Sequence, residues 1–150
     1  MENGNYDALK LENQLCFPLY ACSREVIKLY KPLLDALDLT YTQYIAMMVL
    51  WERQQITLKE LGRLLYLDSG TLTPLLKKLE TKGLVTRIRD QADERSLLVS
   101  LTEAGSALRA QAASIPDQMA KCVDLAPEEA VTLYQLLYKL LNHASGGEDK

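Results

Sequence analysis

The chain has 150 residues, the commonest size for a single domain and too short for two independent enzyme domains. Apolar residues make up 48% and charged residues 25%, which excludes a disordered, collagen-like or low-complexity chain. The formal net charge is −3, and neither a membrane-length apolar run nor a signal peptide is visible, so we expect a cytoplasmic protein.

Two helices are predicted in the first third of the chain. Apolar residues recur at helical spacing over residues 18–37, and Pro32 should kink or break this helix near Tyr30. Thr40 is a suitable N-cap for a second helix. Residues 44–51 of that helix are apolar nearly all round, which places them in a core.

The middle of the chain predicts two short helices followed by a hairpin. Thr57 opens a helix that runs to about residue 65, and Asp68 or Ser69 opens another over residues 70–82. Two segments with partial period-two alternation, LVTRIR and RSLLVSL, then flank five polar residues. This order is typical of a winged helix-turn-helix, whose second short helix enters the major groove of DNA.

Two further helices complete the predicted fold. One opens at Thr102 and continues past Met119, and the other opens at Pro127. The apolar faces of residues 19–37 and 131–141 exceed what one small lobe can cover, so we expect a homodimer.

The predicted fold class is therefore mainly α with a small β-hairpin. Residues 1–150 form a single domain, in which a winged helix DNA-binding lobe spans about 56–101 and the dimerisation helices span about 9–38 and 102–144.

Motifs that would indicate an enzyme or a metal site are absent from the sequence. No P-loop, dinucleotide-binding or HExxH pattern occurs, and the single histidine, His143, lies near the end of the last helix. The cysteines at positions 16, 22 and 122 are odd in number and form no CxxC pair, so we expect free thiols. We predict a protein that is not an enzyme and that needs no metal or cofactor.

A local excess of basic residues over acidic ones indicates the candidate DNA-binding surface. Residues 59–95 hold eight of the seventeen basic residues and six acidic ones, so this segment is +2 and the remainder −5. Small hydroxyl residues and lysines on the second short helix suit phosphates and base edges, and Asp93 can pair with the Arg95 guanidinium on the hairpin. The alternative is a capped, solvated surface helix. The predicted DNA contacts are Ser69, Thr71, Thr73, Pro74, Lys77, Lys78, Arg87, Arg89, Asp93 and Arg95.

Cys16 is the candidate redox residue. If the first helix starts at Pro18, Cys16 lies at or just before its N-cap, where free N–H groups stabilise a thiolate that can attack a peroxide. No Lys or Arg lies between Lys10 and Arg24, so further stabilisation must come from distant groups such as tyrosine hydroxyls. The alternative is a buried, inert cysteine.

These motifs resemble a known family. LYLDSGTLTPLLKKLETKGLVTR followed by DERSLLVSLTEAG is similar to the winged helix of the MarR family, whose wing signature falls on Asp93, Arg95, Leu101, Thr102 and Gly105. LENQLCFPLYA and LDLTYTQYIAMMVLWE resemble the organic-hydroperoxide-sensing branch of that family, and the similarity covers about residues 9–141. Pro18 departs from the family pattern, which favours a helix-compatible residue there.

The resemblance implies a role for several residues. Cys16 is the peroxide-sensing thiol, and its thiolate accepts hydrogen bonds from the partner subunit's Tyr30 and Tyr41, with Tyr20 as a further donor. Cys122 lies about where two-cysteine members carry a resolving cysteine from the opposite subunit. The alternative is that Cys122 is incidental and that a low-molecular-weight thiol caps Cys16.

The leading hypothesis is a homodimeric transcriptional repressor that binds an inverted-repeat operator, senses organic hydroperoxides by oxidation of Cys16 and then releases the DNA. One alternative is a MarR-type regulator released by a small phenolic ligand. Another is a thiol-dependent peroxide-reducing enzyme, in which the basic hairpin and the hydroxyl-rich helix would have no purpose.

Overall fold

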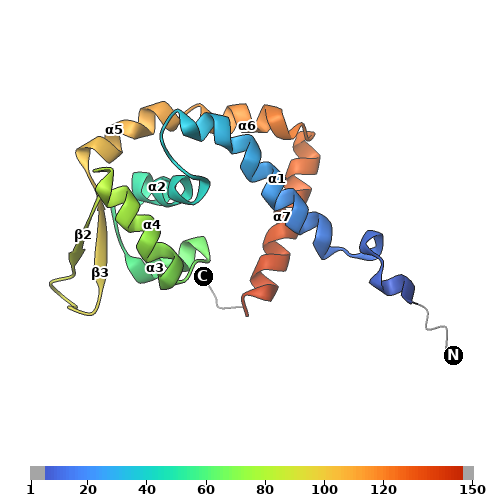
Figure 1. The fold of residues 1–150 in the computed structure, drawn as a ribbon, viewed down its shortest axis with the longest axis horizontal. Coiled ribbons are helices and arrows are strands. Elements are labelled where there is room, and N and C mark those ends of the chain that lie inside the picture. Colours follow the sequence, from blue (N-terminus) through green and yellow to red (C-terminus); the bar gives the residue numbers. More distant parts are fainter. Residues whose placement is uncertain (1–5, 147–150) are drawn as a thin grey trace. The chain divides into compact units, whose positions relative to one another are not determined.

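The computed structural model describes residues 6–146, which divide into two compact units, one ending at Ile115 and one beginning at Pro116. The helices of the first unit are the 3-10 helices η1 (Tyr6–Leu9) and η2 (Leu11–Asn13) and the α-helices α1 (Cys16–Asp35), α2 (Tyr41–Arg53), α3 (Leu58–Leu65), α4 (Ser69–Thr81) and α5 (Glu103–Ala112) (Figure 1). Its strands are β1 (Gln55–Thr57), β2 (Val85–Arg89) and β3 (Leu97–Leu101). Helix α6 (Ile115–Val123) begins at the boundary, and α7 (Pro127–Ala144) lies in the second unit.

Side-chain caps open four helices of the first unit. Thr40 accepts from the backbone of Gln43 in a capping box at the start of α2, and Asp68 accepts from a backbone N–H at 2.8 Å at the start of α4. Thr57 and Thr102 cap α3 and α5 in the same way. The predicted helix starts are confirmed at these positions, because each cap depends only on residues within one turn.

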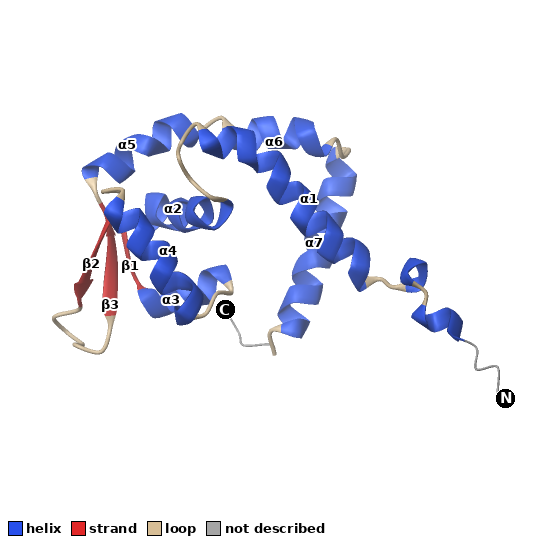
Figure 2. Ribbon diagram, in the orientation of Figure 1, coloured by secondary structure: helices blue, strands red, loops and turns tan. Residues whose placement is uncertain are grey.

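A small antiparallel sheet of order β1-β3-β2 forms the wing (Figure 2). The predicted hairpin is confirmed: Val85 pairs with Leu101 at one end of β2, and Arg89 with Leu97 at the other. Strand β1, which pairs Ile56 with β3, was not predicted. Three residues are too few to show a period-two pattern.

Helix α1 differs from the prediction at both of its prolines. It begins at Cys16 rather than at Pro18, and it continues through Pro32 to Asp35 instead of breaking near Tyr30. Pro18 occupies the third helical position, where its backbone nitrogen would have no intrahelical acceptor in any case. Pro32 lies in the last turn, so little helix follows the hydrogen bond that it removes.

The predicted helix from Thr102 past Met119 is two helices. Helix α5 ends at Ala112, and α6 starts at Ile115 with Pro116 in its second position. A proline there lacks an N–H that the helix does not use, whereas in a continuous helix it would clash with the preceding turn.

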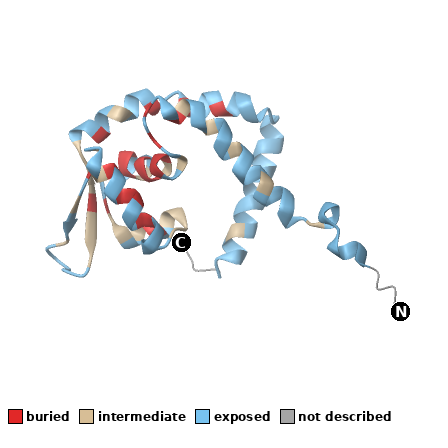
Figure 3. Cartoon of the chain, viewed as in Figure 1, coloured by how far each residue is buried: buried red, intermediate tan, exposed pale blue. Residues whose placement is uncertain are grey.

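The core of the first unit lies between α2, α3, α4 and the sheet (Figure 3). Trp51 of α2 donates its indole N–H to the Gly105 carbonyl at 2.8 Å and so ties α2 to α5. One face of α4 is buried, which leaves its polar face exposed. The buried side chains of α4 are Leu72, Leu75, Leu76 and Leu79.

Helices α1 and α7 expose broad apolar faces (Figure 3). Along α1 the one buried residue is Leu34, and among residues 127–146 every residue except Leu141 is exposed. The exposed apolar residues include Phe17, Leu19, Tyr20, Ile27 and Leu29 on α1 and Val131, Leu133, Tyr134, Leu136, Leu137, Tyr138 and Leu140 on α7. Between residues 6 and 146, no helix has the length and hydropathy needed to cross a bilayer.

Candidate redox site and DNA-binding surface

Cys16 is the first residue of α1 and is exposed. Leu15 before it has helical backbone angles (φ −65°, ψ −38°) and caps no N–H with its side chain. The first N–H groups of α1 are therefore free of a side-chain acceptor from the N-cap, and together with the helix dipole they favour an anion at this end. Cys16 thus lies inside the first turn and not, as expected, at or before the N-cap.

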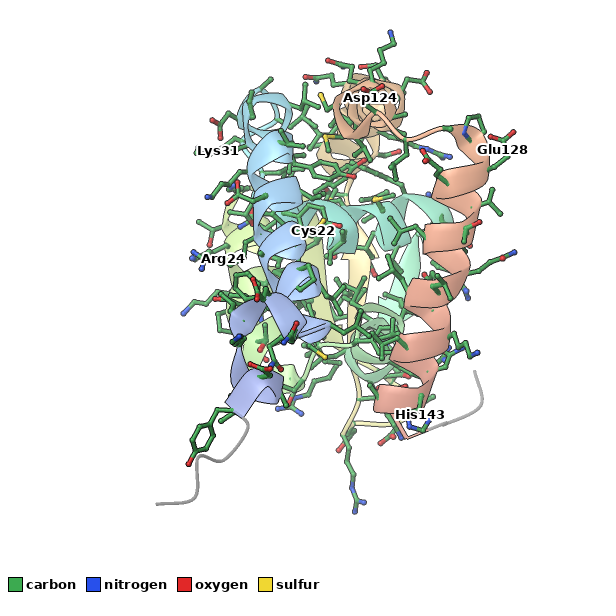
Figure 4. The ribbon with its side chains drawn as sticks, turned by 90° about the vertical axis from the view of Figure 1, so that its right-hand side faces the viewer. Cys22, Arg24, Lys31, Asp124, Glu128 and His143 are labelled. Carbon is green, nitrogen blue, oxygen red and sulfur yellow. The ribbon has the colours of Figure 1, made fainter. Side chains whose placement is uncertain are left out.

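Tyr20 lies one turn after Cys16, a spacing that puts both on one side of α1. Its hydroxyl accepts a hydrogen bond from Arg24 Nη1 at 3.0 Å, and the guanidinium carbon of Arg24 is 5.6 Å from the centre of the ring. The Tyr20 hydroxyl therefore keeps its own proton to donate. Sequence reasoning missed Arg24, although its spacing of four from Tyr20 is visible in the sequence. Arg24 and Lys31, seven residues apart, project from one side of α1 (Figure 4).

Three tyrosines gather where α1 meets the start of α2. The ring centres of Tyr30 and Tyr41 are 4.9 Å apart, and Tyr44 lies 5.9 Å from Tyr30 and 6.4 Å from Tyr41. Burial raises the pKa of all three hydroxyls, with a smaller contribution from Tyr30 at the other two. They stay protonated at neutral pH and can donate hydrogen bonds to an anion.

Within the described residues of one chain, no hydrogen bond joins Cys16 to Tyr30 or Tyr41. All three cysteines are free and exposed: Cys22 lies on α1, and Cys122 is the penultimate residue of α6, in the second unit. Residues 6–146 hold no cluster of three or more ligands that could bind a metal ion.

The polar face of α4 carries the predicted DNA-contacting residues of this helix. The Thr73 hydroxyl donates to the Ser69 carbonyl at 2.8 Å, while neither Lys77 nor Lys78 takes part in an ion pair within the described part of the chain. Both ammonium groups are therefore available for phosphate. All six predicted residues are exposed: Ser69, Thr71, Thr73, Pro74, Lys77 and Lys78.

The tip of the wing corrects one prediction. Asp93 accepts a hydrogen bond from the backbone N–H of Arg95 at 3.0 Å and does not pair with its guanidinium. A carboxylate two residues before an N–H closes an Asx-turn, so Asp93 shapes the tip. Arg89 donates to the Glu94 carbonyl at 2.9 Å, and the Arg95 side chain is exposed.

Arg87 joins the wing to α4. Its backbone N–H and its Nη2 donate to the two carboxylate oxygens of Glu80 at 3.1 and 3.2 Å, and its side chain is only 19% exposed. The hydrogen bond from Arg87 lowers the pKa of Glu80. Arg87 is thus held against the end of α4, whereas Arg89 reaches the tip.

Both the matching family model and the similar curated protein are transcriptional regulators. The family model of the transcriptional regulator SarA/Rot matches residues 28–111. The organic hydroperoxide resistance transcriptional regulator of Bacillus subtilis (strain 168) is 53% identical over 141 residues, which are 94% of this chain and 95% of that protein.

Two solved proteins share the fold at substantial identity. Reduced AbfR bound to DNA is 37% identical, with a TM-score of 0.74 over 91% of this chain and 95% of that one. A disulfide-formed state of AbfR is 36% identical, with a TM-score of 0.63 over 94% and 99% of the two chains. A mutant MarR from E. coli in complex with operator DNA is 30% identical, with a TM-score of 0.74 over 85% and 93%.

Proposed function

Because this chain belongs to the MarR family of winged-helix transcription regulators, in the branch of the organic hydroperoxide regulators, we propose that oxidation of Cys16 releases it from its operator. The protein is a DNA-binding repressor that senses organic hydroperoxides through a cysteine. The observation that carries the choice of Cys16 is its place in the first turn of α1, exposed and next to free N–H groups.

The oxidation is a two-electron step at sulfur. The Cys16 thiolate attacks the terminal oxygen of a hydroperoxide, the O–O bond breaks, and the leaving alkoxide takes a proton to become an alcohol. Cys16 becomes a sulfenic acid. A second thiol then forms a disulfide with it and releases water, and this thiol is either Cys122 of the partner subunit or a low-molecular-weight thiol.

A dimer completes the site in this proposal. The partner subunit's Tyr30 and Tyr41 donate to the Cys16 thiolate, and the exposed apolar faces of α1 and α7 pack between the subunits. Oxidation replaces the charged acceptor by a neutral one and so weakens these hydrogen bonds. A hundredfold loss of DNA affinity needs only about 2.7 kcal/mol of difference between the two states.

On DNA, we assign α4 to the major groove and the wing to the flanking backbone or minor groove. Two such helices related by a twofold axis require an inverted repeat with half-sites about one helical turn apart. Arg89 and Arg95 reach DNA from the wing, while Arg87 holds the wing against α4. We infer that the protein acts in the cytoplasm, where the chromosome of a bacterium lies, and that it does not turn peroxide over as an enzyme.

A gel-shift experiment tests this function. The probe is a duplex selected from random DNA by the reduced wild-type protein, and the oxidant is one equivalent of cumene hydroperoxide. We expect release of wild type and of Cys22→Ser, the matched control on the same exposed helix, but not of Cys16→Ser. Release of Cys16→Ser by the peroxide would remove Cys16 from the mechanism. Release of wild type by salicylate alone would favour the phenolic-ligand regulator, and catalytic loss of the peroxide would favour the enzyme.

A further inference from the structure

Lys82, at the C-terminal end of α4, reaches into the connection between α1 and α2. It is the C-cap residue of α4, and its backbone N–H donates to the Lys78 carbonyl at 3.1 Å. Its ammonium donates to the Asp38 carbonyl, lies 3.4 Å from the Asp38 carboxylate and donates to Gln43 Oε1 at 3.2 Å. Two of the three N–H donors of the ammonium are therefore used on oxygens from another part of the chain, and the Asp38 carboxylate adds an ion pair.

The oxygens that hold Lys82 belong to the segment that positions Tyr41. Asp38 has a left-handed backbone (φ 53°) that turns the chain from α1 into α2. Gln43 is 4% exposed, and its Oε1 also accepts from the Thr40 N–H at 3.1 Å in the capping box of α2. Tyr41 is the first residue of α2 and lies inside that box.

We propose that Lys82 is a positioning residue that couples the tyrosine site to α4 and so carries the oxidation of Cys16 to the DNA-binding surface. This role rests on the proposed function of Cys16 and Tyr41. When Tyr41 loses its anionic acceptor, the start of α2 moves with it, and Gln43 and Asp38 move as part of the same turn. Because Lys82 makes two hydrogen bonds and an ion pair with these two residues, the end of α4 follows.

A simple cap of α4 would behave differently. Loss of a cap lowers the stability of the protein and weakens the binding of reduced and oxidised protein to DNA by the same factor. Loss of a coupling residue changes the ratio of the two affinities, because coupling is the difference between the two states. The dissociation constants of both states therefore separate the two roles.

The test compares Lys82→Met with Lys31→Met in the full-length protein. Lys31 is the matched control because its ammonium also pairs with a carboxylate, that of Asp35 at 2.9 Å, but within one helix. The probe is the selected duplex, and the dissociation constant is measured before and after one equivalent of cumene hydroperoxide. In wild type, oxidation raises the dissociation constant for DNA. We expect Lys82→Met to reduce the ratio of the oxidised to the reduced dissociation constant about tenfold relative to wild type, and Lys31→Met to leave this ratio unchanged.

Further variants keep the result decisive. Lys82→Arg, which retains a charged donor, should keep most of the ratio, and Lys82→Gln replaces Lys82→Met if thermal unfolding shows that the latter does not fold. A ratio equal to wild type in folded Lys82→Met or Lys82→Gln, or an equal change in Lys31→Met, overturns the coupling role alone. Release of Cys16→Ser by the peroxide overturns the proposed function and the coupling role with it.

Discussion

The hydroxyl groups of Tyr30, Tyr41 and Tyr44 lie in a partly buried cluster, and burial raises the pKa of each above its ordinary value of 10.0. A raised pKa means that the folded protein holds the phenol proton more tightly than the unfolded chain does. The resulting stability is fully present below the unfolded value near pH 10 and is lost as the pH rises through the folded pKa. The donors therefore remain intact over the pH range in which a cysteine ionises.

Replacing Tyr41 by Phe is expected to flatten the alkaline loss of stability. In wild type the free energy of unfolding should fall above pH 10, by up to about 1.4 kcal/mol per pH unit for each such group. Tyr41→Phe removes one of them, so its curve falls less steeply. Urea unfolding between pH 8 and 11 measures this, with Tyr6→Phe, a change at a tyrosine of η1 that is 71% exposed and lies outside the proposed dimer faces, as the control. Parallel curves for wild type and Tyr41→Phe would contradict the burial of this hydroxyl.

Gly105 of the wing signature has a steric reason to be glycine. A Cβ there would overlap the Leu84 carbonyl oxygen and lie 2.8 Å from Leu101 Cδ1, and the Gly105 carbonyl accepts from the buried Trp51 indole. We expect Gly105→Ala to lower the free energy of unfolding by about 1–3 kcal/mol, the usual cost of overpacking a core position. The control is Gly70→Ala, where the nearest atom to a Cβ is Asp68 Oδ1 at 3.3 Å, with a change below about 1 kcal/mol. Urea denaturation measures both, and equal losses would contradict the steric account.

Among the helices and strands, the sequence predicts those features that depend on residues close together in the chain, such as helix caps and the hairpin. Thr40 and Thr102 open their helices within one turn of their own position, and the alternating residues of the hairpin pair as expected. Pro116 is the local signal for the break between α5 and α6, because a proline cannot continue the preceding helix.

What escaped prediction depends on contacts between residues far apart or on short segments. The hydrogen bond from Lys82 to Asp38 joins residues that are 44 positions apart, and no local sequence pattern predicts it. The Arg87–Glu80 pair looks, in the sequence, like two unrelated surface charges. Of the candidate site, the exposed polar face of α4 follows from its sequence pattern, whereas the gathering of Tyr44 with Tyr30 and Tyr41 depends on the packing of α1 against α2.

We expect the wing to contribute affinity that does not depend on the DNA sequence, and helix α4 to contribute the preference for particular bases. In the proposed complex Arg95 contacts a phosphate. We therefore expect Arg95→Ala to lower the affinity for every sequence and to reduce the slope of log affinity against log salt by about 0.9 per contact, or twice that for a symmetric dimer. Thr71→Ala should instead change which bases are preferred and leave the slope intact. Fluorescence anisotropy with selected and random duplexes separates the two. Arg109→Ala on α5, an exposed arginine outside the proposed surface, is the control. Equal losses on both duplexes for Thr71→Ala would contradict the assignment of α4 to base reading.

For the whole molecule, the apolar face of α7 is expected to hold the dimer together. Leu136 and Leu140 are 58% and 44% exposed in the single chain, and burying such a side chain fully is worth about 1.5–3 kcal/mol. The double change Leu136→Glu and Leu140→Glu acts twice in a symmetric dimer, so we expect a monomer at micromolar concentration and loss of specific DNA binding. Sedimentation velocity measures the mass. Lys139→Ala on the polar side of α7 should stay dimeric, and a dimer in the double variant would exclude this face.

The fate of oxidised Cys16 decides whether the two subunits become covalently linked. Cys122 is exposed near the end of α6, so its thiol is accessible and can attack the sulfur of a sulfenic acid. Condensation of Cys16 with the partner subunit's Cys122 would form one S–S bond and release one water per site. We expect non-reducing electrophoresis of the peroxide-treated protein to show a cross-linked dimer that persists in Cys22→Ser and disappears in Cys122→Ser.

Without Cys122, the sulfenic acid must wait for an external thiol, so release of DNA by Cys122→Ser should become slower or depend on added low-molecular-weight thiol. Mass spectrometry distinguishes the two routes directly: a disulfide between the subunits removes two hydrogens per bond, whereas capping adds the mass of the small thiol to one chain. If the oxidised wild type runs as a single chain and carries only that added mass, the two-cysteine mechanism is wrong and Cys16 acts alone. The loss of tyrosine hydrogen bonds at Cys16 would then have to supply the whole difference in DNA affinity.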